Sequence, residues 1–363
     1  MPFNPEPPYR HGTAARTGVL LVNLGTPAAP TAAALRPYLA QFLGDPRVVE
    51  IPRLAWWPIL HGIILNVRPA KSAAKYRSIW TPEGSPLAVW TARQARAVGD
   101  ALLRRGHQVE TQWAMRYGEP SVPRALDSLR AAGATRVLVL PMYPQYAAAT
   151  TGSVCDAVFE WARRARRVPE LRFVGEHHDD EGYIDALARR LQAHWAGRPR
   201  AERLVLSFHG LPERSLHLGD PYHCHCLTTA RLLRERLGLP AEQVVVTFQS
   251  RFGKARWLQP YTAPTLQALA AQGVSSVDVM CPGFVADCLE TLEEIAQEAR
   301  DTYLAAGGRD FRYVPCLNGD ARWIEALTDL AERHLQGWPT RQLPDAGALA
   351  AQRERARALG ASD

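Results

Sequence analysis

Four acidic residues in one segment are spaced so that they could bind a metal ion or pass protons. Asp287, Glu290, Glu294 and Glu298 follow one another at intervals of three, four and four residues, and in one α-helix they would form a single column. Like charges in such a column repel each other, so stability alone gives no reason to collect them. Binding of a divalent metal ion or relay of a proton would be a reason to place these carboxylates together. The ordinary alternative is that the four acids form a solvated helix face with no chemical role.

The residues just before this column favour the chemical alternative. An apolar strand runs into Cys281, Pro282, Gly283 and Phe284, which would place the first carboxylates at a buried helix start. The helix dipole stabilises negative charge at that end of a helix.

A histidine stands at the end of another apolar run. His209 follows residues 204–208 (LVLSF), which are typical of a buried strand. A lone histidine in this position is more often a hydrogen-bonded structural residue than a catalyst. If His209 converges with the carboxylates, however, the pair forms a site for a divalent metal or for proton transfer near neutral pH.

Short β-rich runs alternate with longer segments of helical period along most of the chain. Strands are predicted at residues 18–24, 108–113, 136–141, 172–174, 203–208, 244–248, 277–281 and 311–314. Helices are predicted at residues 87–105, 122–132, 154–167, 183–195, 228–237, 265–272 and 287–305. This alternation predicts an α/β fold of two Rossmann-like domains, each a parallel sheet flanked by helices.

Residues 1–150 and 151–315 are the two expected domains, because 363 residues exceed one ordinary core. A helix within residues 316–340 is expected to pack back on the first domain. The tail, residues 341–363, is rich in Ala and Arg and is expected to be a solvated helix or disordered.

Four residues with useful side chains follow predicted strands of both halves. They are Tyr143, His209, Gln249 and Phe284. In open parallel sheets, ligands bind beyond the carboxyl ends of the strands. We therefore predict one active-site cleft between the two domains.

Composition narrows the kind of partner. With 47% hydrophobic and 22% charged residues the chain is globular in type, and its net charge of +7 is modest, with arginines scattered rather than in runs. We expect an anionic small molecule or an acidic membrane surface, and no nucleic acid. Six irregularly spaced cysteines and a first segment without an apolar core favour the cytosol.

The longest apolar run, residues 54–65, contains two adjacent tryptophans and is broken by Pro58 and Gly62. Twelve residues are too few to span a bilayer, which needs about 20. Followed by Arg68, Lys71 and Lys75, the run is typical of a surface that touches lipid or an apolar ligand. A core helix is the equal alternative.

Several familiar motifs are missing from the sequence. There is no GxGxxG after a strand, no GxxxxGK[ST] and no GxSxG elbow. The run HCHC at residues 223–226 lacks a second pair of zinc ligands, so we interpret it as a local loop without a metal. The cysteines at 155, 281, 288 and 316 lack the spacing of an iron–sulfur cluster.

A set of motifs, in order from about residue 18 to 323, resembles the ferrochelatase family, whose members insert ferrous iron into protoporphyrin IX in the last step of haem synthesis. The motifs are NLGTP (23–27), GSP (84–86), MRY (115–117), PMYPQY (141–146) with TTGS (150–153), SFHGLP (207–212), TFQS (247–250) with WLQP (257–260), and PGFVADCLETLEE (282–294). The resemblance implies two Rossmann-like domains with the porphyrin between them.

The resemblance also implies roles for particular residues. His209 and Glu290 match the family's active-site histidine and glutamate, as iron ligands, proton carriers or both. Asp287 and Glu294, with Glu298 farther along, match acidic neighbours that relay protons or iron. Residues that match positions facing the porphyrin are Arg68, Tyr76, Ser85, Arg116, Tyr117, Tyr143, Gln249, Ser250, Trp257 and Phe284.

Two departures from the family pattern matter. Cys288 stands where animal members carry a second histidine, and the cysteine ligands of a [2Fe-2S] centre are missing, with Ala148 in the place of one. We therefore expect no cluster and no tightly bound cofactor, with Fe²⁺ as substrate. The apolar run at 54–65 resembles the lip of members that use protoporphyrin, not coproporphyrin.

Two other functions remain open on the sequence alone. One is a chelatase for another tetrapyrrole or metal, and the other is a porphyrin or haem carrier that does no chemistry. For localisation we expect the cytoplasm, with peripheral contact of residues 54–65 at the inner face of the membrane as the further expectation.

Overall fold

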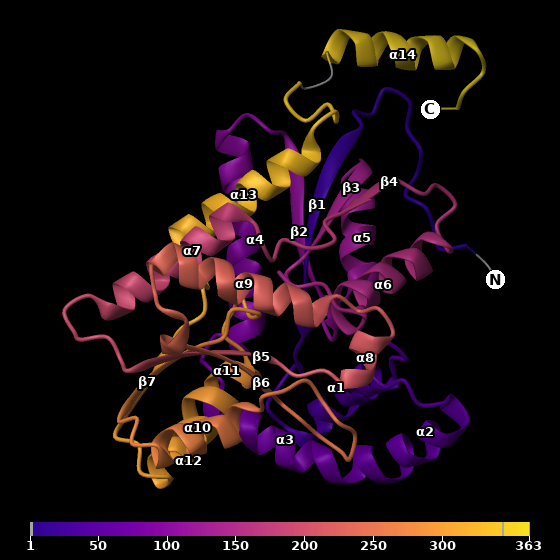
Figure 1. Ribbon diagram of the computed structural model, residues 1–363. Coiled ribbons are helices and arrows are strands. Elements are labelled where there is room, and N and C mark those ends of the chain that lie inside the picture. The colour runs from indigo at the N-terminus through magenta and orange to yellow at the C-terminus, as the bar shows by residue number, and fades with distance from the viewer. Residues whose placement is uncertain (1–2, 343–344, 363) are drawn as a thin grey trace.

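Two parallel four-stranded sheets form the framework of the computed structural model, which describes residues 3–342 and 345–362 (Figure 1). The strand orders are β2-β1-β3-β4 and β6-β5-β7-β8, so both sheets have the same topology. Every neighbouring pair of these strands is parallel. The predicted α/β fold with helix-flanked parallel sheets is confirmed.

Each of the eight predicted strands is present, with ends shifted by a few residues. The shift is greatest where polar residues continue a strand beyond its apolar run, as at the end of β2. The strands are β1 Arg16–Gly25, β2 Val109–Tyr117, β3 Ala134–Pro141, β4 Glu170–Phe173, β5 Arg203–His209, β6 Val244–Gln249, β7 Ser276–Met280 and β8 Asp310–Val314.

Helices cover both sheets, and several were not assigned from the sequence. Those that match predictions are α4 Pro86–Arg104, α5 Val122–Ala131, α6 Ser153–Ala162, α7 Glu181–Trp195, α9 Tyr222–Leu237, α10 Thr262–Ala271 and α13 Ala321–Leu335. The additional ones are α1 Ala32–Gly44, α2 Arg53–Ile59, α3 Leu65–Ile79 and α8 Glu213–His217. In the tail, α14 Ala346–Ala358 is a helix without buried residues, one of the two forms expected there. Short π-helical turns are η1 Leu60–Ile64, η2 Ala148–Gly152 and η4 Glu294–Ala299, and η3 Ala241–Gln243 is a 3₁₀ turn.

One apolar core joins the two sheets. It includes Val19 and Leu21 of the first sheet, Leu206 and Phe208 of the second, and Trp323 of α13, all nearly inaccessible to water. Helices α4, α7, α9 and α13 contribute to the same cluster. Because the burial of apolar surface drives packing, this shared core fixes how the carboxyl ends of the two sheets face each other.

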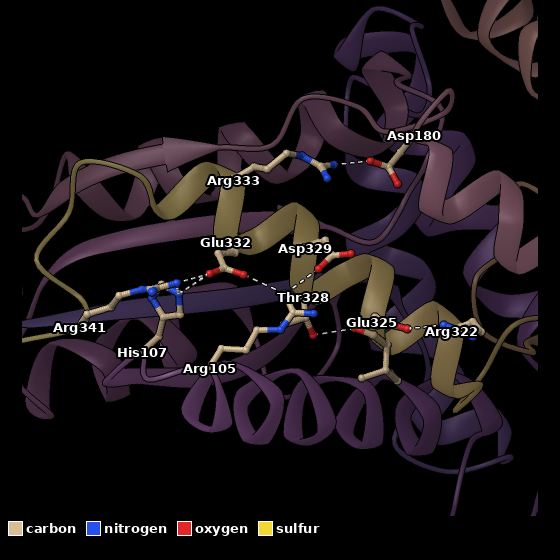
Figure 2. A network of polar contacts seen from close by, with 11 residues as sticks. Arg105, His107, Asp180, Arg322, Glu325, Thr328, Asp329, Glu332, Arg333 and Arg341 are labelled. Carbon is tan, nitrogen blue, oxygen red and sulfur yellow. Dashed lines mark hydrogen bonds and ion pairs between the residues drawn. The ribbon is translucent and has the colours of Figure 1, made fainter.

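Helix α13 is also fastened to the first half by a polar network (Figure 2). Arg105 donates to Asp329 at 2.6 Å and to Glu332 at 2.9 Å. Glu332 also faces His107 at 3.1 Å and pairs with Arg341. The hydrogen bond from His107, followed by those from Arg105 and Arg341, lowers the pKa of Glu332 to about 2.

We expect Glu332→Gln to lower the free energy of unfolding by about 1 kcal/mol at pH 7, because the ion pairs are partly screened by water. The folded state holds the pKa of Glu332 below its unfolded value, so the carboxylate stabilises the fold fully above about pH 4.5 and loses this effect as pH falls toward 2. Urea unfolding of the wild type and of Glu332→Gln measures the difference between their free energies of unfolding. This difference should shrink by more than half between pH 7 and about pH 3.

Glu325→Gln is the matched control, because Glu325 lies on the exposed face of the same helix and pairs only with Arg322, three residues earlier. It should change stability by less than about 0.5 kcal/mol at either pH. A Glu332→Gln deficit that stays constant from pH 7 to pH 3 would contradict the assigned role of this carboxylate.

The apolar run at residues 54–65 lies on the outside of the molecule, in α2 and η1 at the lower right of Figure 1. Leu54, Trp57 and Ile63 are 95%, 55% and 60% exposed, whereas Trp56 turns inward and its indole N–H donates to the carbonyl of Leu43 at 2.7 Å. The core-helix alternative is therefore wrong for most of this run. No helix in the described part of the chain is both long and apolar enough to cross a membrane.

Candidate active site

His209 and Gln249 are the last residues of the adjacent strands β5 and β6 and lie opposite each other in the sheet. Ser207 donates to the side-chain oxygen of Gln249 at 2.8 Å, which orients the amide. The amide nitrogen then donates to the main-chain carbonyl of Glu290 at 2.7 Å. The ends of β5 and β6 thus contact the acidic segment directly.

The ring of His209 has a defined orientation and tautomer. Its Nδ1 lies 2.6 Å from the carbonyl oxygen of Gly210. A carbonyl can only accept, so Nδ1 carries the hydrogen and Nε2 keeps a free lone pair. The rings of Trp257 and Phe284 lie 6.5 and 6.4 Å from the imidazole, centroid to centroid. His209 is therefore a base or metal ligand with apolar walls.

Glu294 is the carboxylate most firmly fixed near this histidine. The N–H and the hydroxyl of Ser250 donate to its two oxygens at 2.6 and 2.5 Å. Ser250 has a φ of 66°, a left-handed conformation that is uncommon for a residue other than glycine. Burial raises the pKa of Glu294, while Ser250 and the nearby His209 lower it and Glu290 raises it. Glu294 can thus hold or release a proton closer to neutral pH than an ordinary glutamate.

Glu290, in α11 Leu289–Leu292, faces the first half of the molecule. Burial raises the pKa of the hydroxyls of Tyr38 in α1 and Tyr76 in α3, and the negative charge of Glu290 raises both further. The two tyrosine rings pack edge to face, 6.5 Å apart. Glu290 therefore lies between the halves, on the same segment as Glu294.

The predicted single column of acids does not form. Asp287 precedes the helix, because Cys288 is the N-cap of α11, and its carboxylate accepts from Asn318 at 2.6 Å, from Tyr313 and from the N–H of Cys316. Glu298 is exposed and pairs with Lys75 of α3. The predicted helix 287–305 is divided into α11, η4 and α12 Arg300–Ala305, so α-helical spacing does not apply across it.

A second polar cluster gathers where β2 ends. Arg116 donates through Nη2 to Asp45 at 2.7 Å and through Nε to the carbonyl and hydroxyl of Ser153 at 2.8 and 2.6 Å. The hydroxyls of Tyr117 and Ser153 donate to the same Asp45 oxygen. These hydrogen bonds and the charge of Arg116 hold the pKa of buried Asp45 below its usual value, although burial opposes them. Arg116 and Tyr117 are thus rigidly placed, with Nη1 engaged by neither Asp45 nor Ser153.

Tyr143 and Tyr38 connect the two clusters. The hydroxyl of Tyr143 is buried and has no hydrogen-bond partner among the described residues. Burial raises its pKa, and Tyr117, Arg116 and Tyr38 are the charged or titrating groups near it. The negative charge of Glu290 in turn raises the pKa of Tyr38. An unpaired buried hydroxyl is uncommon, and a ligand is one way to satisfy it.

The remaining predicted residues lie farther out or are already paired. The guanidinium of Arg68 sits 5.8 Å above the ring of Phe252, in the loop after β6, and its charge also reaches Tyr38. Ser85, buried at the start of α4, accepts from the hydroxyl of Thr26 at 2.7 Å. No contact joins Ser85 to His209 among the described interactions.

The HCHC run is not a loop, so that prediction was wrong. Residues 223–226 lie in the first turns of α9, which begins at Tyr222. The ring of His225 stacks on that of His178, 3.6 Å away, and its Nδ1 accepts from the N–H of Tyr146 at 3.3 Å. Across residues 3–342 and 345–362, no three His, Cys, Asp or Glu side chains form a group that could hold a metal ion.

Cys288, the residue that departs from the animal pattern, is a neutral thiol. Burial raises its pKa well above the ordinary value, and the charge of Glu290 raises it further.

Sequence reasoning missed Asp45, Tyr38 and the contacts of Lys75 with Glu293 and Glu298. Asp45 follows α1 as its C-cap and reaches Arg116 across 71 positions of the chain. A lone Asp before a proline gives no signal for such a contact. Tyr38 and Phe42, four residues apart with stacked rings, are the one local hint that α1 turns an aromatic face inward.

The sequence and the fold are similar to those of known proteins. Residues 16–335 match the family model described as Ferrochelatase. A relative named ferrochelatase from Methylibium petroleiphilum is 68% identical over 361 residues, covering 99% of each chain, and one from Polaromonas sp. is 60% identical, covering 99% of this chain and 100% of the relative. The solved structure of SirB from Bacillus subtilis with Fe³⁺ is similar in fold, with a TM-score of 0.51, 13% identity and coverage of 88% of this chain and 96% of that one.

Proposed function

This chain belongs to the ferrochelatase family, and we propose that the residues around His209 and Glu290 are where ferrous iron replaces the two pyrrole protons of protoporphyrin. The chain is a metal chelatase of haem biosynthesis, and iron is its substrate rather than a resident ion. The observation that carries the assignment of the site is the contact of the His209 strand end with the acidic segment: Gln249, opposite His209, donates to the main-chain carbonyl of Glu290, and Ser250 donates to Glu294. We assign residues 1–150 and 151–315 to the two halves that enclose the porphyrin.

Metal insertion needs a bent ring and an acceptor for two protons. A free-base porphyrin is flat, and its two N–H hydrogens occupy the hole that the metal enters. A site that fits the bent ring better than the flat one lowers the barrier by differential binding. Trp257 and Phe284, whose rings lie 6.5 and 6.4 Å from the imidazole, supply apolar surface for the ring face.

His209 is suited to take the first proton. Its Nε2 lone pair is free because Nδ1 is committed to Gly210, and an imidazole nitrogen with a free lone pair can act as a general base. Glu294, whose pKa burial raises, then accepts the proton or passes it toward solvent with Glu290. The iron approaches along the same carboxylates.

Arg116 is proposed to bind a propionate of the substrate. Asp45 and Ser153 fix its guanidinium and leave Nη1 for a charge-assisted hydrogen bond. Tyr143, with its unpaired hydroxyl, lies beside this group and completes the polar end of the site.

A metal and porphyrin panel tests the function directly. Under anaerobic conditions, addition of Fe²⁺ to the protein with protoporphyrin IX should abolish porphyrin fluorescence and produce the absorbance of haem. Parallel reactions with Co²⁺, Zn²⁺ and sirohydrochlorin distinguish a chelatase for another metal or tetrapyrrole. Porphyrin binding with fluorescence that persists after Fe²⁺ is added would identify a carrier and contradict the proposal.

The exposed apolar face of α2 and η1 is proposed to contact a membrane, from which the hydrophobic porphyrin enters. Leu54, Trp57 and Ile63 point outward, and Arg68 and Lys71 follow on the next helix. The loop with exposed Phe252 continues this face, since Arg68 lies over that ring. Apolar side chains flanked by cations are typical of peripheral contact with anionic lipid.

We expect the triple variant Leu54→Ser, Trp57→Ser and Ile63→Ser to bind vesicles at least about tenfold more weakly, because each lost side chain forfeits roughly 1–2 kcal/mol of burial. Co-sedimentation with phosphatidylcholine vesicles, with and without phosphatidylglycerol, measures the binding of each variant. The control replaces Leu103, Phe159 and Val168, which are similarly exposed elsewhere, at 56%, 50% and 52%. Equal loss in both triple variants would contradict a specific membrane face.

A further inference from the structure

Lys75 of α3 bridges two carboxylates of the acidic segment. Its Nζ lies 3.0 Å from the carboxylate of Glu293 and 2.6 Å from that of Glu298. These residues are 218 and 223 positions away in the chain, so the contact joins the two halves of the molecule. A second contact follows it, because Gln297 donates to the hydroxyl of Ser78, one turn along α3, at 3.4 Å.

The spacing of the two carboxylates excludes an ordinary helix at this point. Residues five apart in an α-helix point in directions roughly 140° apart, too far for one ammonium group to meet both. Here the N–H of Glu298 donates to the carbonyl of Glu293 at 3.0 Å, the five-residue hydrogen bond of a π-helix. The wider turn brings Glu293 and Glu298 to one face, where Lys75 meets both.

The same turn decides where the other carboxylates point. In an α-helix Glu298 would follow Glu294 on one face, four residues on. With the π turn, Glu298 and Glu293 face α3, while Glu294 faces Ser250 and His209. Glu293 and Glu298 thus lie against Lys75, whereas Glu290 and Glu294 belong to the candidate active site.

We propose that Lys75 is a positioning residue that holds residues 293–298 in the π-helical form and so aims Glu294 at Ser250 and His209. This inference rests on the proposed function of that site. The side chain of Glu293 is only 9% exposed, so without Lys75 it is a buried, unpaired charge. Without Lys75, rotation of the helix would expose Glu293 to water and remove the cost of its buried charge. The same rotation would move Glu294 away from Ser250.

Lys75→Met tests the proposal. We expect kcat to fall at least about tenfold, because small misplacements of an acting group have effects of that size or greater. The KM for protoporphyrin should stay within about twofold, since Lys75 touches neither Arg116 nor Tyr143. The amide of Glu298 should exchange with solvent at least about tenfold faster, because its five-residue hydrogen bond is lost. Lys75→Arg should restore both properties.

Arg77→Met is the matched control on the same helix, because Arg77 is exposed and, among the described residues, donates only to the carbonyl of Pro30, at 3.4 Å. It should change neither kcat nor the exchange of the Glu298 amide. If Lys75→Met does not fold, Glu298→Gln removes one arm of the bridge while Glu293 stays paired, and it should show the same losses to a smaller degree.

Normal kcat and normal exchange in Lys75→Met would overturn the proposal, as would a raised KM with unchanged kcat. Exchange reports on the helix whatever the reaction, so this failure is distinct from failure of the proposed function, which would appear as a wild-type protein that does not metallate protoporphyrin.

Discussion

Replacing His209 by alanine is expected to lower the rate of metallation about a thousandfold, while protoporphyrin still binds. General base catalysis contributes roughly 10²–10⁴-fold. The Nδ1 of His209 is committed to Gly210, its ring lies 6.5 and 6.4 Å from those of Trp257 and Phe284, and Glu294 lies near it. Its ring makes few contacts that hold the fold, since its Nδ1 bonds only to the neighbouring Gly210. The loss should therefore lie in kcat rather than in KM.

Stopped-flow loss of porphyrin fluorescence under anaerobic conditions measures this rate, and fluorescence quenching titrations without iron measure binding. His217→Ala is the matched control, because His217 is exposed at the end of α8 and should leave the rate unchanged. Turnover of His209→Ala within about tenfold of wild type would be incompatible with a general-base role.

Glu290→Gln should lower the rate by about a hundredfold, the lower end of what a proton carrier contributes. Glutamine keeps the shape of the side chain but cannot hold the proton or the negative charge that Glu290 presents between the halves, beside Tyr38 and Tyr76. The fold should be intact, because Gln249 is bonded to the main-chain carbonyl of residue 290 and not to its side chain.

The same fluorescence assay measures this effect, and thermal unfolding checks the fold. Asp301→Asn, an exposed acid eleven residues after Glu290 in α12, is the control and should behave as wild type. A Glu290→Gln protein that metallates protoporphyrin at the wild-type rate would show that this carboxylate neither carries protons nor guides iron.

The central strands were predictable because they are short apolar runs with clear boundaries. Residues 204–208 and 244–248 are such runs, and their registers place His209 opposite Gln249. The parallel arrangement then brings these ends together, as the strand-end rule requires. That part of the site needs only local sequence and the geometry of parallel sheets.

The acidic segment was mispredicted for a physical reason. Intervals of three and four residues imply one face only if the helix is α throughout. A π-helical turn changes the angle between successive side chains around the helix axis. Here that turn coincides with a contact to Lys75 from another part of the chain. A local pattern cannot reveal a helix form that tertiary contacts stabilise.

The contacts that fix Arg116 could not be predicted either, because they too come from a distant part of the chain. The MRY motif identified Arg116 and Tyr117, but their shared partner Asp45 lies in the loop after α1, and nothing in residues 42–47 marks a buried carboxylate. Tyr38, which links this cluster to Glu290, lies in a helix that was not assigned at all.

The most direct test of the central claim, that His209 and the carboxylates act at one place on one reaction, is a double-mutant cycle of single-turnover metallation rates. The wild type, His209→Ala, Glu290→Gln and the double variant are mixed with protoporphyrin and Fe²⁺ under anaerobic conditions. Groups that act as a unit have strongly non-additive effects, so the double variant should be no more than about tenfold slower than His209→Ala. A double variant slowed by the full product of the two single effects would mean that the imidazole and the carboxylate act independently, and would contradict the shared site.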